Sequence, residues 1–428
     1  MLNWEKRLSK LVLVLCALLI IKEQVLAQNW AKHYIKNLQR LDMRDLGYPL
    51  VNEIPENSSA ITSLITTNDG MIYGGTSGDE AYLFVFDPSI NKVRHLGKIK
   101  NQEGIHHSLV EDKDGYIYIG TGKDMLKEVK ISKGGLGEEY IDVTLWRDIK
   151  EHFKDYPGGH LYRYNPKESN AKIKLPDMEC EVTDLGIPVK NNSIYALNIS
   201  PDGDEIYGIT YPDGHLFMYQ ISHNVIKDLG EIDKRIVFHG PERYWRSLPR
   251  ALICDDKGNV YTSSTDGEII YYSPGSGKFV PTGSKIPGDY YPAKSFNDYA
   301  VVEYLGKSEN GLIYGGSSDG YLFSFNPENR ELINLGKPRV SRRLRALTIG
   351  KNGKVYIIGG ELSKTKYCQL YCYDPFKGGF ENLGVLIVDR SPYYYWRGHQ
   401  FDCMTTGKDG TIYLGESERR SHLFLYIP

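Results

Sequence analysis

Hydrophobic and polar residues alternate in seven short segments spread along the chain. Each segment has apolar residues at every second position, which is the pattern of a β-strand with one buried face. The seven segments are YLFVFDP (82–88), HLYRYNP (160–166), HLFMYQI (215–221), EIIYYSP (268–274), YLFSFNP (321–327), QLYCYDP (369–375) and HLFLYIP (422–428).

A glycine turn that leads into another strand precedes each of these segments, and an outer-strand motif follows most of them. The turns are DGMIYGG, DGYIYIG, DGDEIYG, KGNVYTS, NGLIYGG, NGKVYII and DGTIYLG, and the later motifs are RHLG, KDLG, INLG and ENLG. Asp-Gly and Asn-Gly pairs favour tight hairpin turns. Together with the apolar run before each turn, every unit has four strands. Seven such units predict an all-β fold, a seven-bladed β-propeller.

The last unit ends with its third strand at Pro428 and needs an outer strand from elsewhere. Near the N-terminus, MRDLGYPL (43–50) resembles IKDLGEI (226–232), so we expect the N-terminal segment to close the last blade. Closure of this kind leaves no long unpaired edge. The second unit carries an insertion at 123–158, and residues 28–428 are expected to form a single domain.

The first residues have the three parts of a secretory signal. A basic start (MLNWEKRLSK) precedes an apolar run (LVLVLCALLII) and VLA before Gln28, which predicts cleavage after Ala27 and a secreted or periplasmic protein. The apolar run is too short for a comfortable membrane span. A formal net charge of −2 argues against a nucleic-acid partner, and we expect a monomer.

Five cysteines would remain after cleavage, and their odd number and irregular spacing do not form a disulfide framework. Cys368 and Cys372 fall on one strand, too far apart to bond to each other. We expect most of the five to be small buried side chains. The sequence contains no CxxC or HExxH motif.

Alignment of the seven turns gives the innermost strands a common register. One level is apolar, and we call it the leucine layer: Leu64, Leu109, Leu197, Leu252, Leu305, Leu347 and Met404. Two residues earlier lies a level that is polar in every blade, the polar ring: Thr62, His107, Tyr195, Arg250, Glu303, Arg345 and Asp402. Strand alternation would place both levels on the same side, with the polar ring at the mouth of the central channel. One residue before the polar ring, His106 is the polar exception in an apolar row.

The segments that lead into several blades are unusually aromatic and basic. PERYWRSLPR (241–250) and SPYYYWRGHQ (391–400) both contain Tyr-Trp-Arg, and RVSRRLR (339–345) is basic. Aromatic rings suit sugars, and arginine suits carboxylate or sulfate. Histidines 160, 215 and 422 begin third strands on the same face, so a divalent metal is possible, although no cofactor is required. The substrate-binding candidates are Arg345, Arg246, Arg397, Trp245, Trp396, His399, Arg343, Glu303, His160 and His106.

These residues favour an anionic glycan as the ligand and β-elimination as the chemistry. Arginine can neutralise a uronate carboxylate, while a His or Tyr removes the C5 proton and another group protonates the leaving oxygen. The catalytic candidates are His107, Tyr195, Tyr244 and Arg250. Two alternatives stay open. Glu303 and Asp402 could serve a glycoside hydrolase, or the propeller could be a non-catalytic module that binds a glycan or a protein.

With its seven blades, signal peptide, IHHS stretch and Tyr-Trp-Arg segments, the chain resembles the secreted β-propeller polysaccharide lyases. It is most similar to the rhamnose–glucuronate lyases of gut Bacteroidetes, which trim arabinogalactan-type glycans and gum arabic. The resemblance implies cleavage of a rhamnose–glucuronate linkage. The related ulvan lyases use His, Tyr and Arg, with a second histidine one hairpin after the first. Here that hairpin returns to Gly122 and Lys123, so the role of a second histidine does not transfer.

Overall fold

The structure is a computed structural model that describes most of the chain in ranges separated by gaps. The described residues are 38–42, 54–123, 130–133, 139–142, 152–169, 177–233, 237–238, 244–245, 248–289, 300–338, 343–359, 368–391, 394–398, 400–417 and 421–428. The predicted signal peptide, 1–27, lies outside them.

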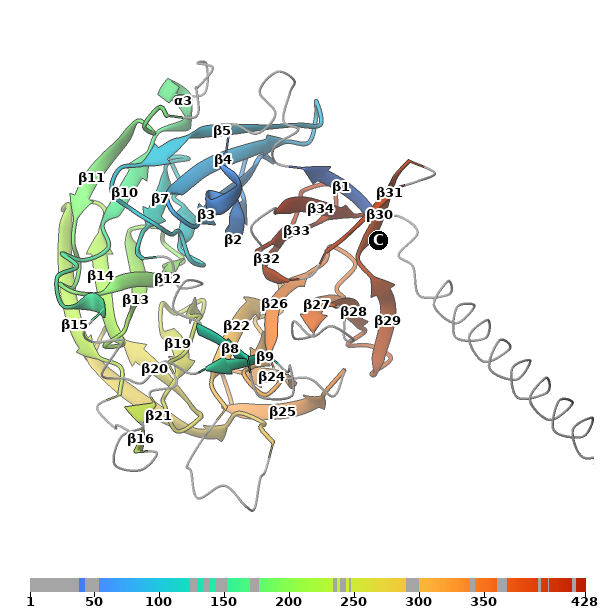
Figure 1. Ribbon diagram of the computed structural model, residues 1–428. Coiled ribbons are helices and arrows are strands. Elements are labelled where there is room, and N and C mark those ends of the chain that lie inside the picture. The colour runs from blue at the N-terminus through green and yellow to red at the C-terminus, as the bar shows by residue number, and fades with distance from the viewer. Residues whose placement is uncertain are drawn as a thin grey trace, which may run out of the picture.

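Seven four-stranded antiparallel sheets surround a central channel, as the repeats predict (Figure 1). In each blade the first strand is innermost and the fourth is outermost. The strands of blades one to three are β2 (Ala60–Thr66), β3 (Ile72–Ser77), β4 (Ala81–Asp87), β5 (Lys92–Ile99); β6 (Leu109–Glu111), β7 (Ile117–Gly120), β10 (Leu161–Tyr164), β11 (Val182–Gly186); and β12 (Ser193–Ile199), β13 (Glu205–Tyr211), β14 (His215–Gln220), β15 (Val225–Glu231).

Blades four to seven repeat this arrangement. Their strands are β18 (Ile253–Cys254), β19 (Val260–Ser263), β20 (Glu268–Ser273), β21 (Lys278–Lys285); β22 (Val302–Lys307), β23 (Ile313–Ser317), β24 (Leu322–Asn326), β25 (Glu331–Gly336); β26 (Leu344–Ile349), β27 (Val355–Gly359), β28 (Gln369–Tyr373), β29 (Phe380–Val385); and β32 (Phe401–Thr406), β33 (Ile412–Glu416), β34 (His422–Tyr426), β1 (Leu38–Asp42).

The N-terminal strand closes the last blade, as predicted, but it is not the predicted segment. β1 pairs antiparallel with β34, with Leu38 opposite Tyr426 and Asp42 opposite His422. The segment that the motif singled out, 43–50, lies outside the described residues. A short motif match could not set the register, because pairing with a strand at the other end of the chain decides it.

Short elements connect or decorate the blades. They are the 3-10 helix η2 (Glu56–Ser58), the helix α3 (Pro166–Ser169), and the hairpins β8 (Lys130–Lys133) with β9 (Glu139–Asp142), β16 (Val237–Phe238) with β17 (Tyr244–Trp245), and β30 (Ile387–Ser391) with β31 (Tyr394–Arg397). The insertion therefore separates β7 from β10, the second and third strands of blade two, where the sequence placed it. In the view of Figure 1, its β8–β9 hairpin is drawn in front of the ring beside β22.

The repeated glycines have two different structural roles. Gly74 in β3 lies against Phe84 of β4, and an added Cβ would come within 2.0 Å of the ring. Gly230 in the KDLG motif has φ of +95° at a register shift between β14 and β15, and its N–H donates to Asp228. The first glycine makes room for an aromatic core residue. The second supplies the left-handed backbone of a bulge.

The hydrophobic core lies between neighbouring blades rather than in one central mass. The leucine layer is part of it, since Leu197 packs in a cluster with Val110 and Leu161 of blade two, and all seven side chains of the layer are buried. The expectation that this layer serves packing is confirmed. The five described cysteines are also buried and free of disulfides, as predicted.

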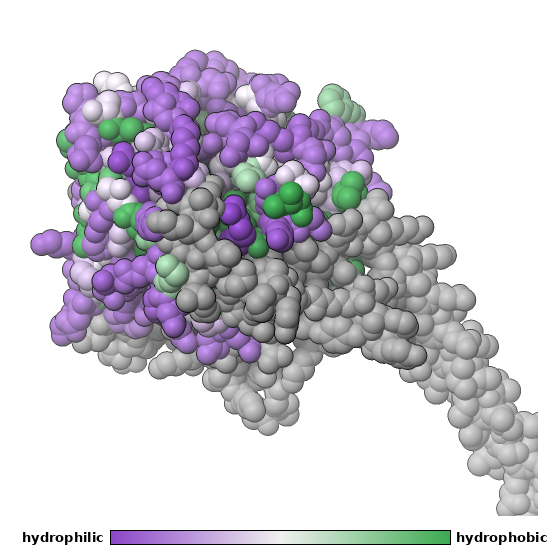
Figure 2. Space-filling model, turned by 90° about the horizontal axis from the view of Figure 1, so that it is seen from above, coloured by the Kyte–Doolittle hydropathy of each residue, from purple (hydrophilic) through white to green (hydrophobic). Residues whose placement is uncertain are grey.

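The visible outer surface is mainly hydrophilic, with scattered hydrophobic residues (Figure 2). Isolated exposed apolar side chains are ordinary on a folded protein. In the described part of the chain, every helix is too short or too polar to cross a lipid bilayer.

Candidate functional site

The polar ring is built on backbone irregularities at one position of the innermost strands. In blade one, the pairing of β2 with β3 shifts between Ile61 and Ser63, so that Thr62 is the extra residue of a β-bulge. A bulge leaves its extra residue outside the ladder and redirects the side chain. Four other blades repeat the shift, at Tyr195, Glu303, Arg345 and Asp402. Simple alternation with the leucine layer, which the sequence predicted, therefore does not describe this level.

His107 reaches the same level without a ladder bulge. It precedes the short strand β6 and has φ of +41°, a left-handed conformation that is uncommon for histidine. Its N–H donates to the carbonyl of Thr62 in blade one, and its own carbonyl accepts from Leu197 N–H in blade three. The backbone of three blades thus holds His107 in this conformation.

Two arginines and two carboxylates of the ring form one ion-pair network. Arg250 Nη1 lies 3.1 Å from Glu303 and 3.9 Å from Asp402, and Arg345 Nη1 donates to Asp402 at 2.9 Å. Glu303 and Asp402 are only 3% and 1% exposed. The exposed Arg343 adds a third cation, with Nε 3.8 Å from Glu303. Buried carboxylates require such partners.

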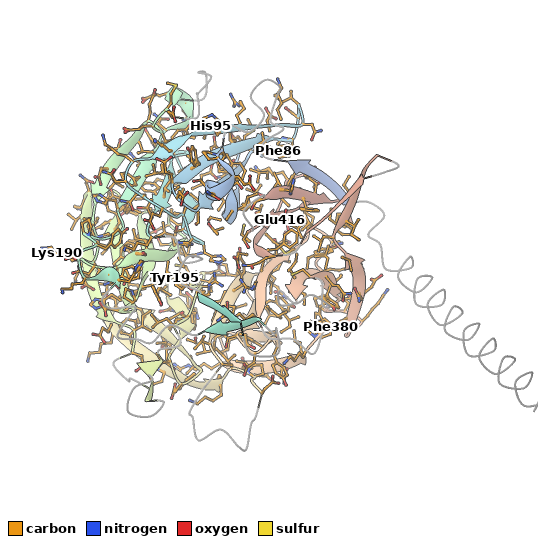
Figure 3. The ribbon with its side chains drawn as sticks, in the orientation of Figure 1. Phe86, His95, Lys190, Tyr195, Phe380 and Glu416 are labelled. Atoms are coloured by element: carbon orange, nitrogen blue, oxygen red, sulfur yellow. The ribbon has the colours of Figure 1, made fainter. Side chains whose placement is uncertain are left out.

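Arg250 joins this network to His107 and Tyr195. Its Nη2 lies 3.3 Å from His107 Nε2, and its guanidinium carbon lies 5.5 Å from the centre of the Tyr195 ring. Figure 3 shows Tyr195 toward the middle of the propeller and Lys190 at its outer edge. Within the described part of the chain, the buried Nε–H of Arg250 has no hydrogen-bond partner. Nη1 of the Arg250 guanidinium is therefore occupied by Glu303 and Asp402. The other edge faces the His107 imidazole through Nη2 and keeps the Nε–H group as a hydrogen-bond donor.

Burial sets the protonation of the ring. It lowers the pKa of His107 to about 3, with a further contribution from Arg250, so the imidazole is neutral near pH 7. Burial also raises the pKa of Tyr195, which keeps its phenol protonated. Burial alone would raise the pKa of Asp402, but Arg345 and Arg250 hold it well below its usual range. The site thus combines a neutral base, a protonated phenol and fixed charges.

His106, the neighbouring histidine, makes structural contacts, and a substrate contact for it stays a prediction. It is 2% exposed, its Nε2 lies 2.7 Å from the carbonyl of Lys123, and its Nδ1 lies 3.5 Å from Ser77 Oγ. Lys123 is the first residue of the insertion, and its Nζ donates to the carbonyl of His152. His106 therefore anchors the start of the insertion, and burial lowers its pKa to about 4.

His160 lies in the outer half of blade two, away from the contacts of the polar ring. It precedes the third strand, its Nδ1 lies 2.9 Å from Asp184 of the fourth strand, and it stacks on Tyr162. His215 makes the same contact with Asp228 in blade three. The repetition indicates a blade-stabilising motif. A substrate contact for His160 stays a prediction.

The structure does not describe the side chains of several predicted site residues. Arg246 and His399 lie outside the described residues. Within the Tyr-Trp-Arg segments, Tyr244 and Trp245 form β17, and Trp396 and Arg397 belong to β31. In Figure 1 the β30–β31 hairpin extends beside β29 and β1. Their roles in binding or catalysis stay predictions.

Tyr304 is a further residue of the site that was not predicted from the sequence. It follows the ring residue Glu303, and its ring centre lies 5.6 Å from that of His107. Its hydroxyl donates to the carbonyl of Met404 in blade seven at 3.3 Å. A cavity of about 400 Å³ continues along the channel from Tyr304, His107 and Arg250 past the leucine layer to Asn68 and Glu111. Comparison of this position across blades could have revealed Tyr304 from the sequence.

Metal binding has no support within the described ranges, where no three His, Cys, Asp or Glu side chains come together as a metal site would need.

Comparison with known proteins supports the fold and gives limited information about function. Residues 100–123 match the family described as two component regulator propeller, a stretch that includes both adjacent histidines. A comparison with curated proteins gives no match.

Among solved structures, a streptogramin B lyase is similar with a TM-score of 0.56 at 11% identity, covering 91% of this chain and 96% of that one. A virginiamycin B lyase from Staphylococcus aureus gives 0.56 at 10% identity, covering 91% and 99%. The extracellular domain of a putative hybrid two component system from B. thetaiotaomicron gives 0.53 at 14% identity, covering 91% of this chain and 39% of that one. At these identities the similarity establishes the propeller fold alone.

Proposed function

We propose that this propeller is a polysaccharide lyase that cleaves a uronic acid linkage, such as rhamnose–glucuronate, by β-elimination. The observation that carries the proposal is the geometry of Arg250. Its Nη1 is held by Glu303 and Asp402, while its other edge combines an unpartnered Nε–H with an Nη2 that contacts neutral His107. A carboxylate that takes the Nε and Nη2 donors is neutralised beside a base.

The reaction then follows from the groups in place. When the substrate carboxylate takes the Nη2 hydrogen bond, the lone pair of His107 Nε2 is released to remove the C5 proton. Arg250 stabilises the enolate that develops. The C4–O bond breaks as the C4–C5 double bond forms, and Tyr195 gives its phenolic proton to the leaving oxygen. The proton on His107 returns to Tyr195 through solvent, which completes the cycle without a change in oxidation state.

The same geometry favours elimination over hydrolysis. A hydrolase needs one carboxyl group that is protonated and can act as an acid. Asp402 has a depressed pKa, and both acids lie near the same Nη1 of Arg250. We therefore assign Glu303 and Asp402 to holding the arginines.

The N-terminal signal pattern supports secretion, and a glycan substrate outside the cytoplasm agrees with it. One of the similar solved structures is a catalytically inactive histidine-to-alanine virginiamycin B lyase with quinupristin. That description shows that a propeller of this shape can serve as a lyase, although for a different substrate.

Ultraviolet absorbance of the new C4–C5 double bond tests the proposal. Purified protein is incubated with a panel of uronic acid glycans that includes gum arabic, with and without a chelator. We expect absorbance to rise, and His107→Ala and Arg250→Ala to lower the rate by about 10²-fold or more. Arg163→Met, which removes an arginine that lies over Tyr116 away from the ring, is the matched control. Reducing sugar without the absorbance would contradict elimination.

A ligand-binding propeller without catalysis is the second candidate. The family match at 100–123 and the similar extracellular domain of a two component system favour it. Calorimetric titration with the same glycans separates the two candidates. Heat of binding without any product, unchanged in affinity by His107→Ala, would support the binding module and overturn the lyase.

A further inference from the structure

Tyr304 occupies a position that is small in the other six blades. In four of those blades the pairing register identifies the equivalent residue as the one that follows the bulge: Ser63, Ala196, Ala346 and Cys403. In blades two and four, the residues that follow His107 and Arg250 are Ser108 and Ala251. A tyrosine here is therefore an exception in an otherwise small row.

The small side chains of this row face the adjacent blade, where space is limited. Cys403 of blade seven lies 3.5 Å from the carbonyl of Ile61 in blade one, and Ala196 packs in the cluster shared with blade four. Close-packed interiors do not accept an additional phenol ring at such a point. The Tyr304 side chain packs against the cluster between blades five and six, and it also reaches across the channel to Met404 of blade seven and to His107 of blade two.

We propose that Tyr304 is a positioning residue that holds the His107 imidazole against Arg250. Its ring lies edge-on to His107, at an interplanar angle of 72°, which is a favourable aromatic arrangement. Its hydroxyl is tied to the Met404 carbonyl, so the ring cannot swing away without losing that bond. Tyr304, His107 and Arg250 together line the cavity that continues toward Asn68 and Glu111.

The Tyr304 ring matters because the state of His107 depends on exclusion of water. Burial is the main cause of its lowered pKa, and the charged or titratable groups that also act on it are Arg250, Asp402, His106 and Arg345. Removal of the Tyr304 ring would enlarge the cavity that His107 already lines and let more water reach the imidazole. The consequence for turnover rests on the proposed function, but the effect on the imidazole does not.

The test is NMR titration of the histidine side chains in the full chain, with His107 assigned by loss of its signal in His107→Asn. In Tyr304→Ala, we expect the pKa of His107 to rise by at least one pH unit and its signals to broaden. Tyr304→Phe, which keeps the ring and loses the hydroxyl, should shift the pKa by less than half a pH unit. Tyr314→Ala is the matched control, because Tyr314 is a buried tyrosine of the same blade and the same hydrophobic cluster.

An unchanged His107 pKa in folded Tyr304→Ala would overturn the proposal, as would an equal shift in Tyr314→Ala. If a lyase substrate is found, Tyr304→Ala should lower kcat more than it raises KM, and Tyr304→Phe should restore most of the rate. If no glycan is cleaved but the His107 pKa shifts as expected, the proposed function fails and the role of Tyr304 stands.

Discussion

The polar ring and the leucine layer lie two residues apart on the same innermost strands, yet they are built in opposite ways. Six of the seven leucine-layer residues sit in ladders, and the layer fills the space between blades. Six of the seven polar-ring residues sit on bulges or on a left-handed residue, and the charges of the ring converge across the channel. A bulge interrupts the regular ladder, and it points a side chain in a direction that regular strand alternation would not give. The comparison separates the part of the strand that holds the propeller together from the part that can meet a ligand.

Removal of a ring carboxylate should have the largest effect on stability. Asp402→Ala leaves Arg345 and Arg250 without a carboxylate that both approach. We expect a loss of about 3–5 kcal/mol in the free energy of unfolding, measured by urea denaturation, because buried charges lose their partner. Asp184→Ala, at an exposed pair, should cost less than about 1 kcal/mol. Equal midpoints of urea denaturation for Asp402→Ala and the wild type would contradict a stabilising role for the ion-pair network.

Truncation in the leucine layer should destabilise without changing the chemistry of the ring. Leu197→Ala removes a 6%-exposed side chain from the cluster between blades two and three. We expect a loss of about 3 kcal/mol in the free energy of unfolding, from lost burial and a cavity. The NMR titration of His107 should match the wild type. A shift in the pKa of His107 would show that the leucine layer and the polar ring are coupled, which would contradict their separation.

Acidification should destabilise the protein between pH 7 and pH 5 because of the two adjacent histidines. The pKa of His106 is about 4 in the folded state and about 6.5 when unfolded, so the unfolded chain binds more protons in this window and stability falls as pH falls. His106 alone accounts for about 2 kcal/mol at pH 5. Urea denaturation at several pH values measures the effect. His106→Asn should reduce the slope clearly, and an unchanged slope would contradict a buried neutral His106.

The smallest effect on stability is expected at residues outside both the polar ring and the leucine layer. His160→Ala removes a partly exposed contact with Asp184 and should change the free energy of unfolding by less than about 1 kcal/mol. A thermal unfolding scan beside His215→Ala, which alters the same contact in blade three, is the comparison. A much larger loss for His160 alone would show that its place in blade two has a further role.

Most of the fold could be predicted from the sequence, because its signals are local and repeated. Period-two alternation, glycine turns and outer-strand motifs each depend on a few neighbouring residues, and seven copies reinforce one another. The same alignment also grouped His107, Arg250, Glu303, Arg345 and Asp402 at one level. It could not predict the bulges, because a bulge is a property of two paired strands.

The sequence by itself determined the propeller, its seven blades, its closure by an N-terminal strand and the polarity of the ring. Tertiary structure alone decided which segment closes the ring, that His106 anchors the insertion while His107 enters the channel, and that Tyr304 crosses it. The physical reason is distance along the chain. Patterns report what a residue favours among its neighbours in sequence. Arg250 meets His107 only after seven blades have closed around one axis.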